Sequence, residues 1–159
     1  MARSRIVGIV LDILIALLVV FNILAAMGVI MYVPTGSMVP TLMPGDLIIV
    51  KPTTTEELIH DYMTSDEKPI IVYEFNRLSY RGYIVHRLYK IIYDENGNLV
   101  GFKAKGDANP TPDLFIVKPE DVKGKVIARI PYLGYTIIFA RTPLGFTSVS
   151  YTHLTLPTN

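Results

Sequence analysis

The residue of this sequence best placed to act as a nucleophile is Ser37, which lies in a segment rich in proline and glycine. Gly36 allows the backbone to turn sharply before the serine, and Pro40 stiffens the chain after it. Such a turn can hold a hydroxyl exposed while neighbouring amides point at a developing oxyanion. An ordinary loop has the same composition, because serines beside glycine and proline are common and few of them are nucleophiles.

A serine nucleophile needs a base within hydrogen-bond reach, and one predicted strand, residues 83–93, carries two candidates. His86 is the first, although a lone histidine in an apolar strand is more often structural than catalytic. Lys90 is the second, because period-two spacing places it on the same face as His86. We rank His86 above Lys90, and we interpret His60, in a polar segment, as a structural or exposed residue.

Two aspartates, Asp107 and Asp113, lie on one predicted loop, and either is able to accept a hydrogen bond from the base. We choose Asp113, because two prolines just before it stiffen the chain into an extended path toward the strand that carries His86. Asp107 lies in a Gly-Asp-Ala-Asn turn, where its side chain has ready amide partners nearby in the sequence. We therefore predict a supporting role for Asp107.

Short runs of β-type sequence must position these residues, which predicts a mainly β domain. The predicted strands cover residues 47–50, 70–75, 83–93, 99–105 and 125–130. Asn96-Gly97 separates two of them and favours a hairpin, because this pair tolerates positive φ. The polar segment 53–68 interrupts the pattern, and we expect a surface insertion there with one short helix over residues 56–62.

The apolar segment 6–32 predicts a single transmembrane helix, because it exceeds the roughly 20 residues needed to cross a bilayer. A cleaved secretory signal is the alternative, but its apolar core would be shorter, about 7–15 residues. Arg3 and Arg5 precede the segment and no basic cluster closely follows it, so the positive-inside rule places the rest of the chain outside the cytoplasm. Ser37 would then lie about five residues beyond the anchor, close to the bilayer surface.

The composition of the chain limits the other classes of function. With 159 residues there is room for one compact domain beside the membrane segment. A net charge of +1 without a basic cluster makes nucleic acid an unexpected partner. The chain has no cysteine, which excludes disulfides, thiolate nucleophiles and zinc–thiolate sites.

Four segments resemble, in the same order along the chain, the sequence boxes of type I signal peptidases. They are residues 37–42 (SMVPTL) with 45–46 (GD), 82–87 (GYIVHR), 105–113 (KGDANPTPD) and 124–134 (GKVIARIPYLG). Bacterial members of this family usually have lysine where this sequence has His86. The histidine resembles the archaeal and endoplasmic-reticulum branch instead, and it implies a serine–histidine mechanism.

The resemblance implies a signal-peptidase-like β fold and a membrane-bound serine endopeptidase that removes signal peptides. In this interpretation Ser37 attacks the scissile carbonyl, His86 is the general base and acid, and Asp113 completes the triad. The amide of Ser37 and the hydroxyl of Thr35 would hold the oxyanion. Secretory preproteins and membrane lipid are the implied partners, together with the translocation channel or accessory subunits. No metal or cofactor is implied.

We expect four parts: 1–32, a short cytoplasmic N-terminus and transmembrane helix; 33–134, an extracytoplasmic catalytic β domain; 135–148, which resembles the approach to a second transmembrane helix of this branch and would be a truncated one; and 149–159, a non-native tail. The tail resembles a translated sequencing-library adapter, so we expect no function for Ser150 or His153. A different class of function stays open, namely a non-catalytic membrane-anchored β-domain subunit or binding module. The presence of the nucleophile, the base and the aspartate favours the enzyme.

Overall fold

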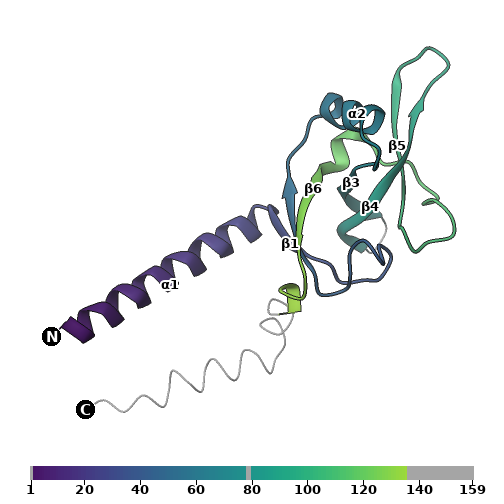
Figure 1. The fold of residues 1–159 in the computed structure, drawn as a ribbon. Helices are drawn as coiled ribbons and strands as arrows, with labels where there is room; N and C mark the ends of the chain where they lie inside the picture. The colour runs from purple at the N-terminus through teal and green to yellow at the C-terminus, as the bar shows by residue number, and fades with distance from the viewer. Residues whose placement is uncertain (1, 78–79, 136–159) are drawn as a thin grey trace.

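The computed structural model describes residues 2–77 and 80–135 and contains one long helix and a mainly antiparallel β domain (Figure 1). Six strands form one sheet in the order β1-β2-β6-β3-β4-β5. The elements are α1 (Ala2–Ala26), β1 (Ile30–Tyr32), β2 (Leu47–Lys51), α2 (Thr55–Thr64), β3 (Ile70–Arg77), β4 (Tyr80–Tyr93), β5 (Leu99–Lys105), a 3-10 turn η1 (Pro119–Asp121) and β6 (Val122–Ile130). The five predicted strands are confirmed, and β1 is an additional strand. Of the predicted segments 135–148 and 149–159, all residues except 135 lie outside the described part of the chain.

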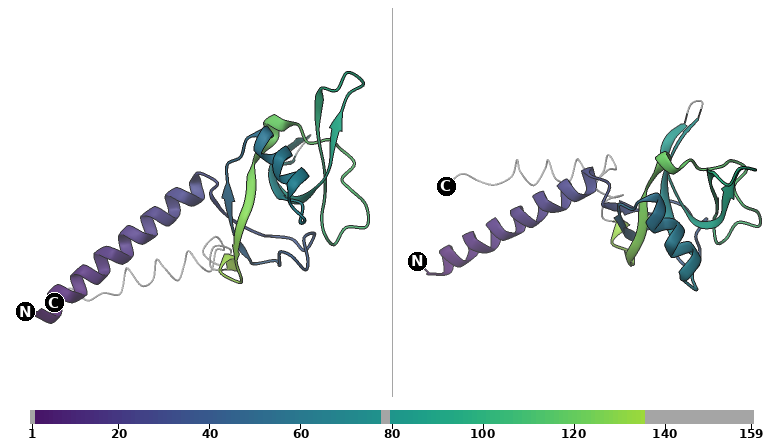
Figure 2. Two further views of the ribbon diagram at one scale, coloured as in Figure 1. Left: turned by 45° about the horizontal axis from the view of Figure 1, so that its top comes forward. Right: turned by 90° about the horizontal axis from the view of Figure 1, so that it is seen from above.

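Helix α1 extends away from the β domain in every view of Figures 1 and 2. Its segment Arg5–Ala26 is long and apolar enough to cross a membrane, and none of it is buried against the rest of the protein. The helix ends at Ala26, so the prediction that it continues to Tyr32 is wrong. Gly28 has a φ of +72°, a conformation that commonly terminates helices, and β1 follows.

Strand β1 forms because its apolar residues pair with β2, Ile30 opposite Ile49 and Tyr32 opposite Leu47. A short apolar run satisfies a helix and a strand equally well, so its sequence alone did not reveal this pairing. Ser37 consequently comes eleven residues after the end of α1 rather than about five. Chain length alone therefore does not hold Ser37 at the surface of a membrane.

The predicted hairpin is present as β4 and β5, which pair from Arg87–Lys105 to Tyr93–Leu99. Its turn is closed by the Asp94 carboxylate, which accepts hydrogen bonds from the amides of Asn96 and Asn98 at 2.9 and 2.7 Å. Gly97 has a φ of +83°, as the turn requires.

Helix α2 confirms the predicted short helix, but the segment 53–68 is not a mere surface insertion. The hydroxyl of Thr54 caps the helix by accepting from the amide of Glu57 at 3.2 Å. Leu58 is only 1% exposed and lies in the same apolar cluster as Ile71 and Phe102. The helix therefore completes the core on one side of the sheet.

The loops that follow the two edge strands meet each other. The serine loop, residues 33–46, follows β1, and the aspartate loop, residues 106–113, follows β5. The amide of Ala108 donates to the carbonyl oxygen of Ser37 at 2.9 Å, which joins the two loops. The sheet order places β1 and β5 at opposite ends, so this contact brings residues from both ends of the sheet into one site.

Candidate active site

The hydroxyl of Ser37, the imidazole of His86 and the carboxylate of Asp113 form one hydrogen-bonded chain. The Oγ atom of Ser37 lies 3.1 Å from Nε2 of His86. On the other side of the ring, Nδ1 lies 2.8 Å from Oδ2 of Asp113. Because an ionised carboxylate only accepts hydrogen bonds, Nδ1 is assigned the proton, which leaves Nε2 with a lone pair directed at the serine hydroxyl. The structure thus brings together the three residues predicted to act together.

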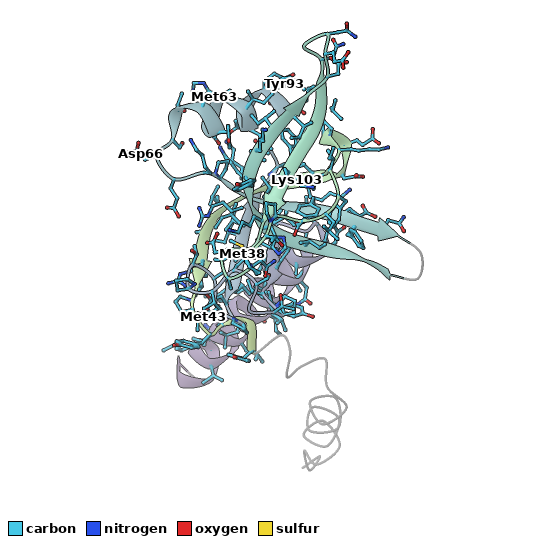
Figure 3. All side chains as sticks on the ribbon, turned by 90° about the vertical axis from the view of Figure 1, so that its right-hand side faces the viewer. Met38, Met43, Met63, Asp66, Tyr93 and Lys103 are labelled. Atoms are coloured by element: carbon cyan, nitrogen blue, oxygen red, sulfur yellow. The ribbon has the colours of Figure 1, made fainter. Side chains whose placement is uncertain are left out.

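Apolar anchors fix the serine loop beneath Ser37. Met38 and Leu42 are 1% and 2% exposed and belong to a core cluster with Ile48 and Val72. Met38 lies in the middle of the domain in Figure 3, whereas Met43 lies at its lower end. Burial of each of these two anchors stabilises the loop by roughly 1.5–3 kcal/mol. Ser37 is therefore carried by a loop that is packed, not by a free connection.

A buried carboxylate closes the serine loop at its end. Asp46 is 1% exposed and accepts a hydrogen bond from the amide of Met43 at 2.9 Å. It also pairs with the guanidinium of Arg129 at 3.2 Å, from the neighbouring strand β6. In the sequence Asp46 stands out only as part of a Gly-Asp pair, which indicates no particular role. Its contacts assign it the task of holding the loop on the sheet.

His86 projects from β4 and is 7% exposed. His86 and Leu88 of this strand are buried, and the next buried residue is Ile91. The pairing of β4 with β5 is irregular between Leu88 and Lys90. A β-bulge of this kind shifts the alternation by one residue. Lys90 is consequently exposed, and the expectation that it shares a face with His86 is wrong.

Asp113 reaches His86 because the end of the aspartate loop is hydrogen-bonded to β5. The amide of Asp113 donates to the carbonyl of Ala104 at 2.9 Å, and Ala104 lies opposite Leu88 of β4, two residues from His86. The side chain of Asp113 is 11% exposed. Burial acts to raise the pKa of this carboxyl, but hydrogen bonds from His86 and Tyr73 outweigh it, and the pKa lies below its usual value. Asp113 is thus held as a carboxylate.

Tyr73 is a member of this site that the sequence analysis missed. Its hydroxyl donates to Oδ2 of Asp113 at 2.7 Å and lies 3.5 Å from Nδ1 of His86. The residue comes from β3, pairs across the sheet with Ile84 and is 1% exposed. Its apolar neighbours in the sequence indicated only a buried strand position, and nothing there pointed to Asp113, 40 residues away.

Asp107 forms an ion pair with Arg87. Among the described residues, its carboxylate makes no hydrogen bond with His86. Two guanidinium nitrogens of Arg87 donate to its two oxygens, each at 2.8 Å, and the hydroxyl of Thr41 donates at 2.5 Å. The pair with Arg87 lowers the pKa of Asp107 below its usual range, against an opposing effect of burial. The partners of Asp107 are therefore distant in sequence, and the expectation of nearby amide partners is wrong. The cluster ties β4 to both loops.

The other candidates lie apart from this chain of hydrogen bonds. Thr35 belongs to the serine loop with its side chain exposed, and its role in an oxyanion site stays a prediction. His60 is exposed on α2. Ser150 and His153 lie outside the described residues. Within residues 2–77 and 80–135, no cluster of three or more histidine, aspartate or glutamate side chains is arranged to hold a metal ion.

No protein-family model matches the chain, and no curated protein matches it either. The order in which the polar atoms of Ser37, His86 and Asp113 meet is similar to that of a serine–histidine–aspartate triad, an arrangement that recurs on unrelated folds.

Proposed function

We propose that this protein is a membrane-anchored serine endopeptidase that removes N-terminal signal peptides from secretory preproteins. The observation that carries the proposal is the hydrogen-bonded chain from Ser37 through His86 to Asp113. The three residues belong to three separate segments, and their polar atoms meet in the order that nucleophile, base and orienting carboxylate require. The resemblance of the sequence boxes to type I signal peptidases supplies the substrate class.

In the acylation step, Oγ of Ser37 attacks the scissile carbonyl carbon while Nε2 of His86 takes the hydroxyl proton. The carboxylate of Asp113 stabilises the imidazolium that results. The tetrahedral oxyanion is held by the backbone amide of Ser37, with the hydroxyl of Thr35 as a second donor. Collapse of this intermediate breaks the peptide bond, and His86 gives its proton to the leaving amine, the new N-terminus of the mature protein.

In the deacylation step, water attacks the ester on Ser37 and His86 again acts as the base. The proton returns to Oγ of Ser37 and the signal peptide leaves with a carboxylate end. No atom changes oxidation state in this cycle, and His86 later donates each proton that it accepts.

The apolar helix α1 supports a location where signal peptides are found. Its segment Arg5–Ala26 has the length and composition of a transmembrane anchor, and the positive-inside rule then places the β domain outside the cytoplasm. An extended peptide can add as a strand beside an exposed sheet edge, with shallow pockets at alternate positions that accept only small side chains. This would account for the preference for alanine-like residues that the family resemblance implies.

The proposal is tested with the full chain purified in detergent and then placed in lipid vesicles. The substrate is a preprotein with an intact signal peptide, and mass spectrometry locates the cleaved bond. Ser37→Ala should abolish cleavage, whereas Ser65→Ala, which changes an exposed serine at the end of α2, should leave it unchanged. Cleavage after a small residue near the membrane supports the proposal. Preprotein binding without cleavage by the parent chain in all lipids would instead indicate a non-catalytic binding module.

A further inference from the structure

Tyr73 and His86 both donate to the same oxygen of Asp113. The hydroxyl of Tyr73 lies 2.7 Å from Oδ2, and Nδ1 of His86 lies 2.8 Å from that atom. The two donors come from β3 and β4, which are directly paired strands. The ring of Tyr73 also meets the imidazole edge-on, with 6.5 Å between the ring centres. One carboxylate oxygen is thus fixed from two sides.

We propose that Tyr73 is a positioning residue of the triad, which holds Oδ2 of Asp113 against Nδ1 of His86. The inference rests on the proposed function in one respect, namely that His86 acts as the base. It goes beyond that function because it assigns the orientation of the aspartate to a buried tyrosine on another strand. Tyr73 touches neither substrate nor serine in this account and acts through Asp113.

The hydroxyl of Tyr73 is suited to this task because it remains a donor at every relevant pH. Burial and the hydrogen bond to Asp113 both raise the pKa of Tyr73 well above its usual value. The hydroxyl therefore has to donate, and a carboxylate is the acceptor it meets. A neutral donor also spreads the charge of the carboxylate without adding a competing positive charge beside the imidazole.

Removing this donor should change the charge balance at His86 in a defined direction. Without Tyr73 the carboxylate of Asp113 would lose its fixed orientation but stay within reach of His86, because its amide is bound to Ala104 and the histidine would be its remaining donor at Oδ2. Its negative charge would then act more fully on the imidazole and favour the protonated ring. The other charged groups near the triad, Asp107 and Lys103, are left in place by the substitution. The imidazole should consequently retain its proton to higher pH.

The first test is the pH–rate profile of Tyr73→Phe, which keeps the buried ring and removes only the hydroxyl. Loss of one hydrogen bond to a charged group should lower kcat about tenfold at neutral pH. KM should stay unchanged, and the acid limb of the profile should move to higher pH by about one unit. The matched control is Tyr62→Phe, which removes a hydroxyl that donates to the carbonyl of Tyr89 at 3.1 Å. A profile for Tyr73→Phe that coincides with that of Tyr62→Phe would overturn the inference.

The second test does not depend on peptidase activity. In the full chain in detergent micelles, NMR follows the ring of His86 through a pH titration in a Ser37→Ala background, with and without Tyr73→Phe. The midpoint should rise by about one pH unit when the hydroxyl is removed. In an added Asp113→Asn background, Tyr73→Phe should have no such effect. An unchanged midpoint would contradict the role of Tyr73 even in an active peptidase, and so would the same shift without the Asp113 carboxylate. If the expected shift is found in a chain that cleaves no preprotein, only the proposed function is refuted.

Discussion

Gly106 lies so close to Ser37 that a β-carbon built on Gly106 would stand 2.6 Å from the carbonyl oxygen of Ser37. This approach allows the amide of Ala108 to bind the same oxygen and so to fix the serine against the aspartate loop. A real β-carbon would displace backbone, because the nearest atom is a main-chain oxygen and not a flexible side chain.

Gly106→Ala should therefore reduce activity much more than stability. We expect kcat to fall by about 100-fold, because a shift of about 1 Å at the nucleophile costs that much in near-attack geometry. Gly8→Ala is the control, since a β-carbon at Gly8 in α1 meets nothing within 4 Å. Preprotein cleavage rates and thermal unfolding of both variants provide the measurement. A Gly106→Ala protein that cleaves at the parent rate would show that this contact does not position Ser37.

Activity should depend on the neutral imidazole of His86. A protonated ring has no lone pair with which to accept the hydroxyl proton of Ser37, so acid should suppress the rate. His86→Ala should lose nearly all turnover, because Nε2, the proposed base, is in contact with Ser37. His86→Lys should be inactive near neutrality, because an unperturbed lysine has a pKa of about 10.4 and stays protonated. Full turnover by His86→Lys would indicate a site already suited to a lysine base.

Asp113→Asn and Asp107→Asn should affect different properties. An asparagine at position 113 cannot stabilise the imidazolium or fix the same tautomer, and the corresponding change in a well-known serine protease lowers turnover by about 10⁴. Asp107→Asn should keep the triad and weaken the ion pair with Arg87, which is 19% exposed, at a cost of about 1–3 kcal/mol in unfolding free energy. Turnover and urea unfolding, measured for both variants, compare the two roles. Loss of turnover in Asp107→Asn alone would exchange them.

Acid should destabilise the domain through the carboxylates of Asp107 and Asp113. The ion pair with Arg87 lowers the pKa of Asp107. Burial acts to raise the pKa of Asp113, but the hydrogen bonds from His86 and Tyr73 outweigh it and the pKa is lowered. A lowered pKa in the folded state contributes stability that is complete above the unfolded value, about 3.9, and is lost as the pH falls through the folded value.

Thermal unfolding followed by circular dichroism between pH 7 and pH 2 checks this dependence. The decline below about pH 4 should be steeper in the parent than in Asp107→Asn, which lacks one of the carboxyl groups that titrate there. Ser65→Ala, which removes no titrating group, should follow the parent curve. Equal slopes in the parent and Asp107→Asn would show that the pair with Arg87 contributes no pH-dependent stability.

Much of the sheet could be predicted because its strands are local patterns. The runs at 70–75 and 99–105 alternate or are β-branched. Asn96-Gly97 marks the turn between β4 and β5. The end of α1 could not be predicted, since Ile30–Tyr32 is apolar and its structure is decided by pairing with β2. The exposure of Lys90 depends on a β-bulge, which has no clear signal in a single sequence.

The site could be predicted as far as its motifs reach. Ser37, His86 and Asp113 come together as the sequence boxes suggested, and their distances are those of direct hydrogen bonds. Tyr73 and Arg87 could not be assigned, because their contacts with the aspartate loop join residues 40 and 20 positions apart. Their contacts depend on which strands are neighbours, and that order follows from packing of the whole sheet.

The most direct test of the central claim is to look for the covalent intermediate on Ser37. The full chain in lipid vesicles is mixed with a preprotein, quenched in acid within one turnover and analysed by mass spectrometry. We predict an ester between the oxygen of Ser37 and the C-terminal residue of the signal peptide, absent from Ser37→Ala and scarce in His86→Ala. Preprotein cleavage that continues at the parent rate in Ser37→Ala, with no ester on Ser37 in the parent, would contradict the account.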